Sequence, residues 1–514
     1  MPRLGSVSLS SSSSLDSNTQ SLQDCRIAVV GAGPSGLLLA HELLLHGASH
    51  VSLYEQRTLP VAKNDESSTT ASSITDSGGG RAYALGLGTR GRTALQSIPG
   101  LWDAVTKVGL LSERFDLHIN KLRICLRKES NAKDKDSLIQ PSLLLFQSDL
   151  CKVLFRELQN RYQEDRLNVS FGTSVVNVQV DDMRLVTAPT SSKTKTTVTE
   201  PFDLIVGCDG VNSVVRQHMP KLKTREEILP GEFKVARVSQ MPPQLHPSAV
   251  ALLIPSGQKT ESEKESEESG QSLSATSTTA FVEPTRNGTA CVLFTSRNAT
   301  ADRLLSSQNE TELADLIVTR FPKLQGIEHE AAKSLAATTR TSTASSVECE
   351  TFHSDRIVLV GDAAHSTGGV SGQGVNSALQ DSVVLSNALC QELYNCQDAR
   401  DPIKRKDAIR QALLHYSQQQ VPEARALYDL SFGPNSKSFR KKFKNAVKLA
   451  LDTIFKGKFG IGDSPLQTKL TTSLTPFSEI RRERDALYDE PFPPAEYWDD
   501  SILQLHQQML PKDL

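Results

Sequence analysis

The sequence predicts an α/β fold in which helices cover a parallel sheet. Three apolar, strand-like runs, at residues 26–30, 203–206 and 356–360, each end in a glycine-containing turn that leads into a helix-like segment. Strand-like and helix-like segments also alternate through most of the chain, which is typical of α/β proteins. The run RIAVV at 26–30 is apolar after its first residue, as a strand buried on both faces should be.

The length of the chain limits the number of domains, and its charge argues against a nucleic-acid partner. With 514 residues, the chain is long enough for two or three packed units. Its 57 Lys and Arg residues nearly balance its 59 Asp and Glu residues, and the net charge is -2. Because nucleic-acid binders carry a basic excess, we expect no nucleic-acid partner.

Cysteine usage and the N-terminus bear on the location of the protein. Eight scattered cysteines without a CxxC pattern favour buried, reduced thiols in an intracellular protein. The serine-rich segment 1–23 is expected to be a disordered N-terminal tail, with an organellar transit peptide as the alternative. No run has the length and apolarity of a membrane-spanning helix. We therefore expect a cytoplasmic protein, the alternatives being targeting to an organelle or peripheral attachment to a membrane.

The first strand-like run opens a pattern typical of dinucleotide binding. It is followed by GAGPSG at 31–36, a helix-like segment that ends at Gly47, and a second strand-like run, 50–54, that leads to Glu55. A lone GxGxxG often arises by chance, whereas the order of strand, glycines, helix, strand and acid is much more specific. The sequence therefore predicts a Rossmann-type βαβ unit.

Each residue type in this unit has a physical role. Gly31 permits the tight turn, Gly33 leaves room for a pyrophosphate, and Gly36 lets the helix lie close to the strand. The helix N-terminus offers N–H groups and the positive end of its dipole to the phosphates. Glu55, nineteen residues after Gly36, is placed to accept both hydroxyls of an adenosine ribose. The expected contacts are Gly31, Ala32, Gly33, Pro34, Ser35, Gly36, Glu55, Gln56 and Arg57.

Two later turns indicate which dinucleotide is bound. PFDLIVGCDGVNSVVR at 201–216 contains Asp209-Gly210, and DRIVLVGDAAHSTGGVSGQGVNSALQD at 355–381 contains Gly361-Asp362 before a glycine-rich loop and a helix. With the first turn, they resemble the aromatic-ring flavoprotein monooxygenases of the p-hydroxybenzoate hydroxylase fold, which carry GxGxxG, DG and GD motifs in this order. The resemblance covers about residues 24–400. It implies FAD as the cofactor.

The resemblance also implies the domain organisation. The fold class is α/β, with a Rossmann-type FAD-binding domain, an interleaved mixed-sheet substrate domain and a helical C-terminal region. The FAD-binding domain is expected in three parts, at 24–105, 138–220 and 350–400. The substrate domain and the C-terminal region are expected at 106–137, at 221–349 with a disordered insertion at 257–279, and at 401–514.

The residues of the later motifs support contacts to a flavin. Asp362, at the carboxyl end of a strand, can accept hydrogen bonds from the ribityl hydroxyls, and the alternative is a helix N-cap aspartate. The helix that begins near Gly374 would direct its N-terminus at the pyrimidine edge, where its dipole would stabilise the reduced anion by up to ~2 kcal/mol. Asn376 would hold the ring by backbone or side-chain contacts. The expected contacts outside the first unit are Gln147, Asp209, Gly210, Asp362, Gly374, Val375 and Asn376.

The activity that the resemblance implies is monooxygenation. FAD, reduced by NAD(P)H, would react with O2, and a flavin C4a-hydroperoxide would hydroxylate a small, aromatic substrate. Because the flavin performs this chemistry, we expect no catalytic side chain and no metal, and we expect His365 to be structural. The alternatives are a non-oxygenating flavin reductase of the same fold and a degenerate FAD-binding protein without turnover.

Within that family, the chain is most similar to the kynurenine 3-monooxygenases. The similarity rests on the segments 80–95, 203–216, 356–365 and 418–431. The reaction type is therefore expected to transfer, but departures put the substrate in doubt.

Three departures concern single residues. Gln147 stands where the family usually has an arginine that contacts FAD, and Gly369 stands where it has a proline. Arg114 is the nearest candidate for an arginine that would bind a substrate carboxylate, although Phe115 aligns with that position. Gln147 and Gly369 are the features that favour the degenerate alternative.

The segment 437–459 is basic and amphipathic. We expect it to pack against the catalytic domain, and the alternative is a helix on a membrane surface. The sequence does not predict an oligomeric state.

Overall fold

The structure is a computed structural model of the chain. It describes residues 22–58, 83–112, 114–127, 141–192, 195–256, 278–297, 299–300, 302–396, 398–432, 448 and 466–488.

A six-stranded sheet forms the first layer of the fold. Its order is β18-β19-β12-β1-β2-β8, and every pair is parallel except β18 with β19. The central strands are rich in Val, Ile and Leu that are almost fully buried, because helices cover this sheet. The strands are His353–Ser354, Ile357–Leu359, Leu204–Gly207, Arg26–Val30, His50–Glu55 and Leu167–Phe171.

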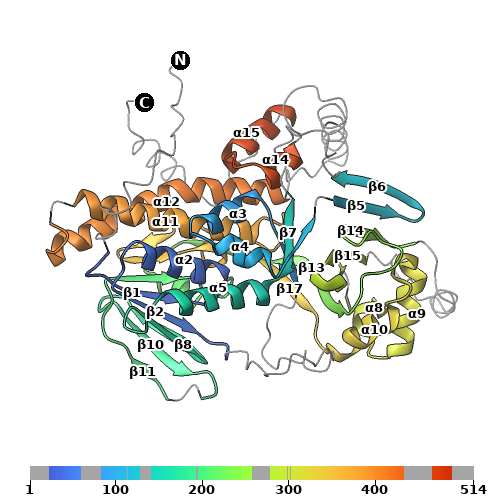
Figure 1. Cartoon of the computed structure of the whole chain (residues 1–514), viewed down its shortest axis with the longest axis horizontal. Coiled ribbons are helices and arrows are strands. Elements are labelled where there is room, and N and C mark those ends of the chain that lie inside the picture. The colour runs from blue at the N-terminus through green and yellow to red at the C-terminus, as the bar shows by residue number, and fades with distance from the viewer. Residues whose placement is uncertain are drawn as a thin grey trace.

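Helices from distant parts of the chain pack around this sheet (Figure 1). α2 (Pro34–Leu45) contacts both α5 (Gln147–Arg161) and α11 (Gly374–Asn395). α11 also contacts α3 (Thr89–Gln96), which precedes α4 (Leu101–Thr106). The sheet and these helices share one hydrophobic core.

An eight-stranded mixed sheet forms the second layer. Its order is β20-β17-β13-β16-β15-β14-β5-β6, and only β14 and β5 run parallel. In Figure 1 this sheet extends to the right, where α8, α9 and α10 cover one of its faces. The strands are Ser366–Thr367, Ser342–Cys349, Thr224–Val238, Ala290–Ser296, Thr279–Pro284, Ala249–Ile254, Arg114–Ile119 and Leu122–Arg127, and the helices are Arg303–Ser306, Glu310–Arg320 and Glu328–Ala337.

Two small antiparallel sheets and several short helices complete the body. One sheet has the order β3-β7-β4 and the other β11-β10-β9. Their strands are Ala84–Leu87, Ser142–Phe146 and Leu110–Ser112, and then Thr197–Val198, Arg184–Pro189 and Thr173–Gln179. The short helices are α6 (Val214–His218), η2 (Arg286–Gly288), η3 (Pro322–Leu324) and η4 (Gly361–Ala363).

The C-terminal part is helical, as predicted. α12 (Pro402–Phe432) runs beside α11 and contacts α15 (Phe477–Tyr488), and α14 (Leu466–Thr472) lies next to α15. The buried Tyr416 hydroxyl donates to the Leu359 carbonyl at 3.2 Å, which ties α12 to the six-stranded sheet. The predicted fold class, with two interleaved sheets and C-terminal helices, is confirmed.

Two predicted boundaries need correction. The N-terminal tail cannot extend to residue 23, because Leu22 is 1% exposed and belongs to the core. The insertion predicted to end at residue 279 ends earlier, because Thr278 is fully buried and β15 begins at Thr279. The rest of both segments, and all of 437–459 except Lys448, lie outside the described residues. No helix in the described part of the chain is long and apolar enough to cross a membrane.

Candidate FAD site

The three glycine-containing turns meet at one edge of the six-stranded sheet. β1, β12 and β19 are parallel neighbours, with Val30 opposite Gly207 and Gly207 opposite Leu359. The turns at 31–36, at 209–210 and at 361–362 each follow the carboxyl end of one of these strands. This edge is where open α/β sheets bind their ligands.

The first two turns are in direct contact. Gly31 has a φ of 103°, and a Cβ there would lie 2.4 Å from the Cys208 carbonyl oxygen and 2.9 Å from the Asp209 Cα. Only glycine is compatible with both the backbone angle and this approach. The third turn closes the group, since a Cβ on Gly361 would lie 3.4 Å from the Ser35 Oγ.

The start of α2 leaves open space in which a phosphate group would fit. No described heavy atom lies within 4 Å of the place where a Cβ on Gly33 would stand, and the same is true of Gly210. Gly33 is the N-cap of α2, Pro34 follows it, and no described side chain caps this helix. An open glycine and an uncapped helix N-terminus fit the pyrophosphate of FAD.

Glu55 links the end of β2 to the first turn. Its carboxylate accepts the Ala32 N–H at 2.9 Å and the Arg57 N–H at 2.8 Å, and the side chain is largely buried. Gln56 and Arg57 are exposed, and the Arg57 Nε lies 3.6 Å from Glu55. Two backbone donors therefore orient the carboxylate that is expected to bind the ribose.

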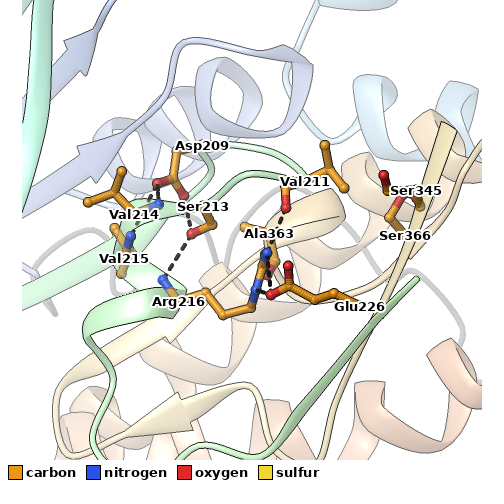
Figure 2. A network of polar contacts seen from close by, with 10 residues as sticks. All are labelled: Asp209, Val211, Ser213, Val214, Val215, Arg216, Glu226, Ser345, Ala363 and Ser366. Carbon is orange, nitrogen blue, oxygen red and sulfur yellow. Dashed lines mark hydrogen bonds and ion pairs between the residues drawn. The ribbon is translucent and has the colours of Figure 1, made fainter. Parts of the chain in front are cut away.

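Asp209 shapes its own turn (Figure 2). Its carboxylate accepts the Ser213 hydroxyl at 2.5 Å and the N–H groups of Val214 at 2.6 Å and Val215 at 3.2 Å. Burial raises the pKa of Asp209, and these hydrogen bonds oppose that rise. Asp209 thus fixes the start of α6 and the conformation of the turn at Gly210.

Arg216 connects the second and third turns, and the sequence did not single it out as a site residue. Its guanidinium donates to the carbonyls of Val211 at 2.6 Å and Ala363 at 2.8 Å and forms an ion pair with Glu226 at 2.9 Å (Figure 2). The side chain is only 1% exposed. The signal in the sequence was one arginine at the end of the segment GVNSVVR that follows Asp209.

The third turn lies beside the N-terminus of α11. Asp362 is the middle residue of η4, and a Cβ on Gly374 would lie 3.9 Å from its Oδ1. Val360 is the N-cap of η4 and Gln373 the N-cap of α11, so neither helix uses Asp362 as its N-cap. This placement fits the expected contact with the ribityl chain.

Asn376 uses its side chain to hold neighbouring backbone. The Oδ1 accepts the Gly88 N–H at 2.8 Å, and the Nδ2 donates to the carbonyls of Gly86 at 3.0 Å and Gly372 at 3.4 Å. Asn376 therefore ties β3 and the start of α3 to α11. The side chain of Asn376 is therefore engaged by the protein itself. The candidates for the expected flavin contact are the backbone groups of Asn376 and of the preceding Val375.

Gln147 presents a buried acceptor at the first residue of α5. Its Oε1 has no hydrogen-bond partner among the described residues. One turn later, the Cys151 thiol lies close enough to Arg57 and Glu55 for both charges to shift its pKa, although burial is the largest cause of its rise to about 12. A buried acceptor without a partner fits a hydrogen bond to a ligand.

One predicted site residue, Arg114, lies elsewhere. Arg114 binds Asp116 through its Nε at 3.0 Å, and Asp116 pairs with Ala251, which belongs to the core under the helices of the eight-stranded sheet. Arg114 therefore points away from the other candidate residues, and Phe115 occupies the opposite face of β5. Gly369, which replaces the proline usual in the family, has a φ of 82°, a backbone conformation that proline cannot adopt.

Comparison with known proteins agrees with this geometry. The family described as FAD binding domain matches residues 24–412. The chain belongs to this family. A kynurenine 3-monooxygenase from Salinispora tropica is 26% identical over 375 residues, which cover 71% of this chain and 72% of that protein. The Drosophila willistoni kynurenine 3-monooxygenase is 23% identical over 478 residues, or 89% of this chain and 90% of that protein.

Solved structures share the fold. 2-Methyl-3-hydroxypyridine-5-carboxylic acid oxygenase superposes with a TM-score of 0.57 at 19% identity, covering 79% of this chain and 90% of that chain. PqsL from Pseudomonas aeruginosa, a probable FAD-dependent monooxygenase, has a TM-score of 0.53 at 18% identity, with coverages of 79% and 96%. The predicted family and FAD as cofactor are confirmed, and the protein is an FAD-dependent oxidoreductase.

Proposed function

We propose that this oxidoreductase is a monooxygenase that uses NAD(P)H and O2 to hydroxylate a small aromatic substrate. The observation that carries the proposal is the meeting of the three turns at one sheet edge, combined with membership of the FAD-binding family. FAD supplies the redox and oxygen chemistry when bound. The residues of the chain bind and orient it and exclude water from the reaction.

The proposed contacts follow the order of the FAD molecule. The start of α2 at Gly33 holds the pyrophosphate, Glu55 the adenosine ribose, and Asp362 the ribityl chain. The N-terminus of α11, at Gly374, faces the pyrimidine edge. Its dipole favours the reduced anion by up to ~2 kcal/mol. Gln147 donates or accepts one hydrogen bond without adding charge.

Several relatives are kynurenine 3-monooxygenases, so kynurenine is the first compound to test. The guanidinium of Arg114 donates to the Asp116 carboxylate, and we do not assign Arg114 to the binding of a substrate carboxylate. The eight cysteines form no disulfide, which supports a proposed intracellular, cytoplasmic location.

The decisive experiment measures three properties of the purified protein with FAD. We expect a flavin spectrum that NAD(P)H bleaches, O2 consumption that depends on an aromatic compound, and a product heavier by one oxygen atom. The compounds to test are kynurenine and a panel of phenols. NAD(P)H oxidation without oxygen in any product would identify a reductase, and a protein that refuses FAD would identify a degenerate binding protein.

A further inference from the structure

Three polar side chains form a row across the eight-stranded sheet. Glu283 on β15 pairs with Cys291 on β16, and Cys291 pairs with Arg237 on β13. Directly paired residues in a sheet place their side chains on the same face. Glu283, Cys291 and Arg237 are called the polar row below.

The polar row faces the FAD-binding part of the molecule. The neighbouring residues Val282, Val292 and Ala236 are fully buried in the core under α8, α9 and α10, so the polar row occupies the other face. On that face the Cys291 sulfur meets the Ala84 backbone, and the Arg237 guanidinium lies 4.3 Å from the centre of the Phe146 ring.

Ala84 and Phe146 connect the polar row to the candidate FAD contacts. They pair with each other across β3 and β7. Phe146 directly precedes Gln147, whose buried Oε1 has no partner among the described residues. Two residues after Ala84, the Gly86 carbonyl accepts from Asn376 at the start of α11. The polar row thus lies opposite the segment that carries Gln147 and the segment that Asn376 anchors.

The wall around Glu283 is aromatic and apolar. Phe281, two residues earlier on the same face of β15, packs edge to face against Phe115 with ring centres 5.9 Å apart. Leu252 pairs with Phe281, and Val250 pairs with Phe115. A flat aromatic ring is the kind of group that such a wall accepts.

Glu283 is an isolated acid in this wall. Among the described residues, no hydrogen bond or ion pair to its carboxyl group is present, and burial raises its pKa to about 8. Burial also raises the pKa of Cys291 to about 12, so the thiol stays neutral and carries no charge. Glu283 is partly buried, and a donor group on a ligand would supply the hydrogen-bond partner that the described residues do not.

We propose that Glu283 determines substrate specificity by accepting a hydrogen bond from an amino or hydroxyl group on the ring of an aromatic substrate that packs on Phe115 and Phe281. The substrate class is therefore aromatic amines and phenols. Once Glu283 is ionised, above about pH 8, a carboxylate at the same ring position would face a like charge and is disfavoured. The inference rests on the proposed function in one respect, because it takes this face of the sheet as the wall of the substrate site.

The test measures binding to the FAD-loaded protein through the change in its flavin absorbance spectrum. Phenol is compared with anisole and aniline with N,N-dimethylaniline, since methylation removes the donor and keeps the ring. At pH 9, where most of the Glu283 carboxyl groups are ionised, we expect the donor compounds to bind roughly tenfold or more tightly than their methylated counterparts, as for a hydrogen bond to a charged acceptor. In Glu283→Leu this preference should vanish, and in Glu283→Gln it should be partly retained.

The matched control is Glu227→Leu, a partly exposed glutamate on β13 that forms an ion pair with Arg225 in the same sheet. It should leave the preference unchanged. A wild-type protein that does not prefer phenol or aniline, or a preference that survives in Glu283→Leu, overturns the inference. Equal weakening of all four compounds in Glu283→Leu also overturns it, because that indicates a structural role.

O2 consumption is measured separately with the same compounds. If the preference depends on Glu283 but no compound supports O2 uptake, the inference stands and the proposed monooxygenase function fails. If O2 uptake occurs without any dependence on Glu283, the proposed function stands and the inference fails.

Discussion

The Nε2 atom of His365 lies 2.7 Å from the Oδ2 atom of Asp381, and the same oxygen accepts the Gly361 N–H at 3.2 Å. Both side chains are buried, and the Phe352 ring stacks on the imidazole with ring centres 5.4 Å apart. Asp381 therefore connects α11 to the residue before Asp362. His365 and Asp381 together hold the third turn in place through these contacts, which is the behaviour of a structural histidine.

Asp381→Asn should lower the pKa of His365. Burial lowers this pKa, but the Asp381 carboxylate, together with the charge of Asp362, more than compensates, so the pKa lies above its ordinary value. A raised histidine pKa stabilises the folded state fully below about pH 6.5 and loses that contribution as the pH rises through the folded pKa. We expect NMR titration of Asp381→Asn to show the lower pKa of His365. The decrease in unfolding free energy with rising pH that His365 causes in the wild type should be absent from this variant. Asp407→Asn, an exposed aspartate, is the control. An unchanged titration curve for His365 would refute the assignment.

Gly33→Ala should weaken FAD binding without destabilising the apoprotein. The added methyl group meets no described atom, but it occupies the space expected for the pyrophosphate. We expect the Kd for FAD to rise by about tenfold, or about 1.4 kcal/mol, in a fluorescence titration. Gly31→Ala is the comparison, because its methyl group collides with Cys208 and should lower the unfolding temperature as well. Equal FAD affinity in Gly33→Ala and wild type would show that the pyrophosphate does not bind at this turn.

Gln147→Ala should weaken FAD binding by roughly two- to tenfold, the value of one ordinary hydrogen bond. The Oε1 has no described partner, so its removal should leave the unfolding temperature of the apoprotein within about 1 °C of wild type. Isothermal titration with FAD and thermal unfolding without it separate the two effects. Gln147→Arg restores the residue usual in the family and should bind FAD at least as tightly as wild type. A destabilised apoprotein with unchanged affinity would mean that Gln147 is structural.

Glu42→Gln should remove one source of pH dependence from folding. Glu42 lies in α2, where burial raises its pKa to about 7 although the Ser97 hydroxyl donates to it. A folded acid that holds its proton more tightly than the unfolded one makes the fold less stable as the pH rises from about 4.5 to 7. The loss is on the order of 3 kcal/mol. Urea unfolding at pH 5 and pH 8 should show this fall in wild type and a smaller fall in Glu42→Gln. Glu164→Gln, which is exposed, should behave as wild type.

The glycine turns could be predicted because their signal is local. The strand, the glycines and the following helix are adjacent in sequence, and the positions of Gly31, Gly33 and Glu55 follow from that order. The meeting of the three turns depends only on their strands being parallel neighbours, which the alternation of strands and helices already favours.

The residues that could not be predicted depend on partners far away in sequence. Arg216 donates to Ala363, which lies 147 residues later, and Asn376 bonds Gly88, which lies 288 residues earlier. The face of the sheet to which the Arg114 side chain points depends on the register between β5 and β14. A shift by one residue would place Arg114 on the face that Phe115 now occupies. Glu283 was missed because a single acid in a strand carries no signal until Cys291 and Arg237 stand beside it.

The order of strands in the two large sheets limits how the molecule can be divided. The chain passes from β1 and β2 to β5 and β6, returns to β8 and β12, crosses to the strands from β13 to β17, and comes back to β19. No single cut in the backbone separates one sheet from the other. Limited proteolysis at one loop should therefore leave a nicked but intact particle, and neither half is expected to survive expression as a fragment.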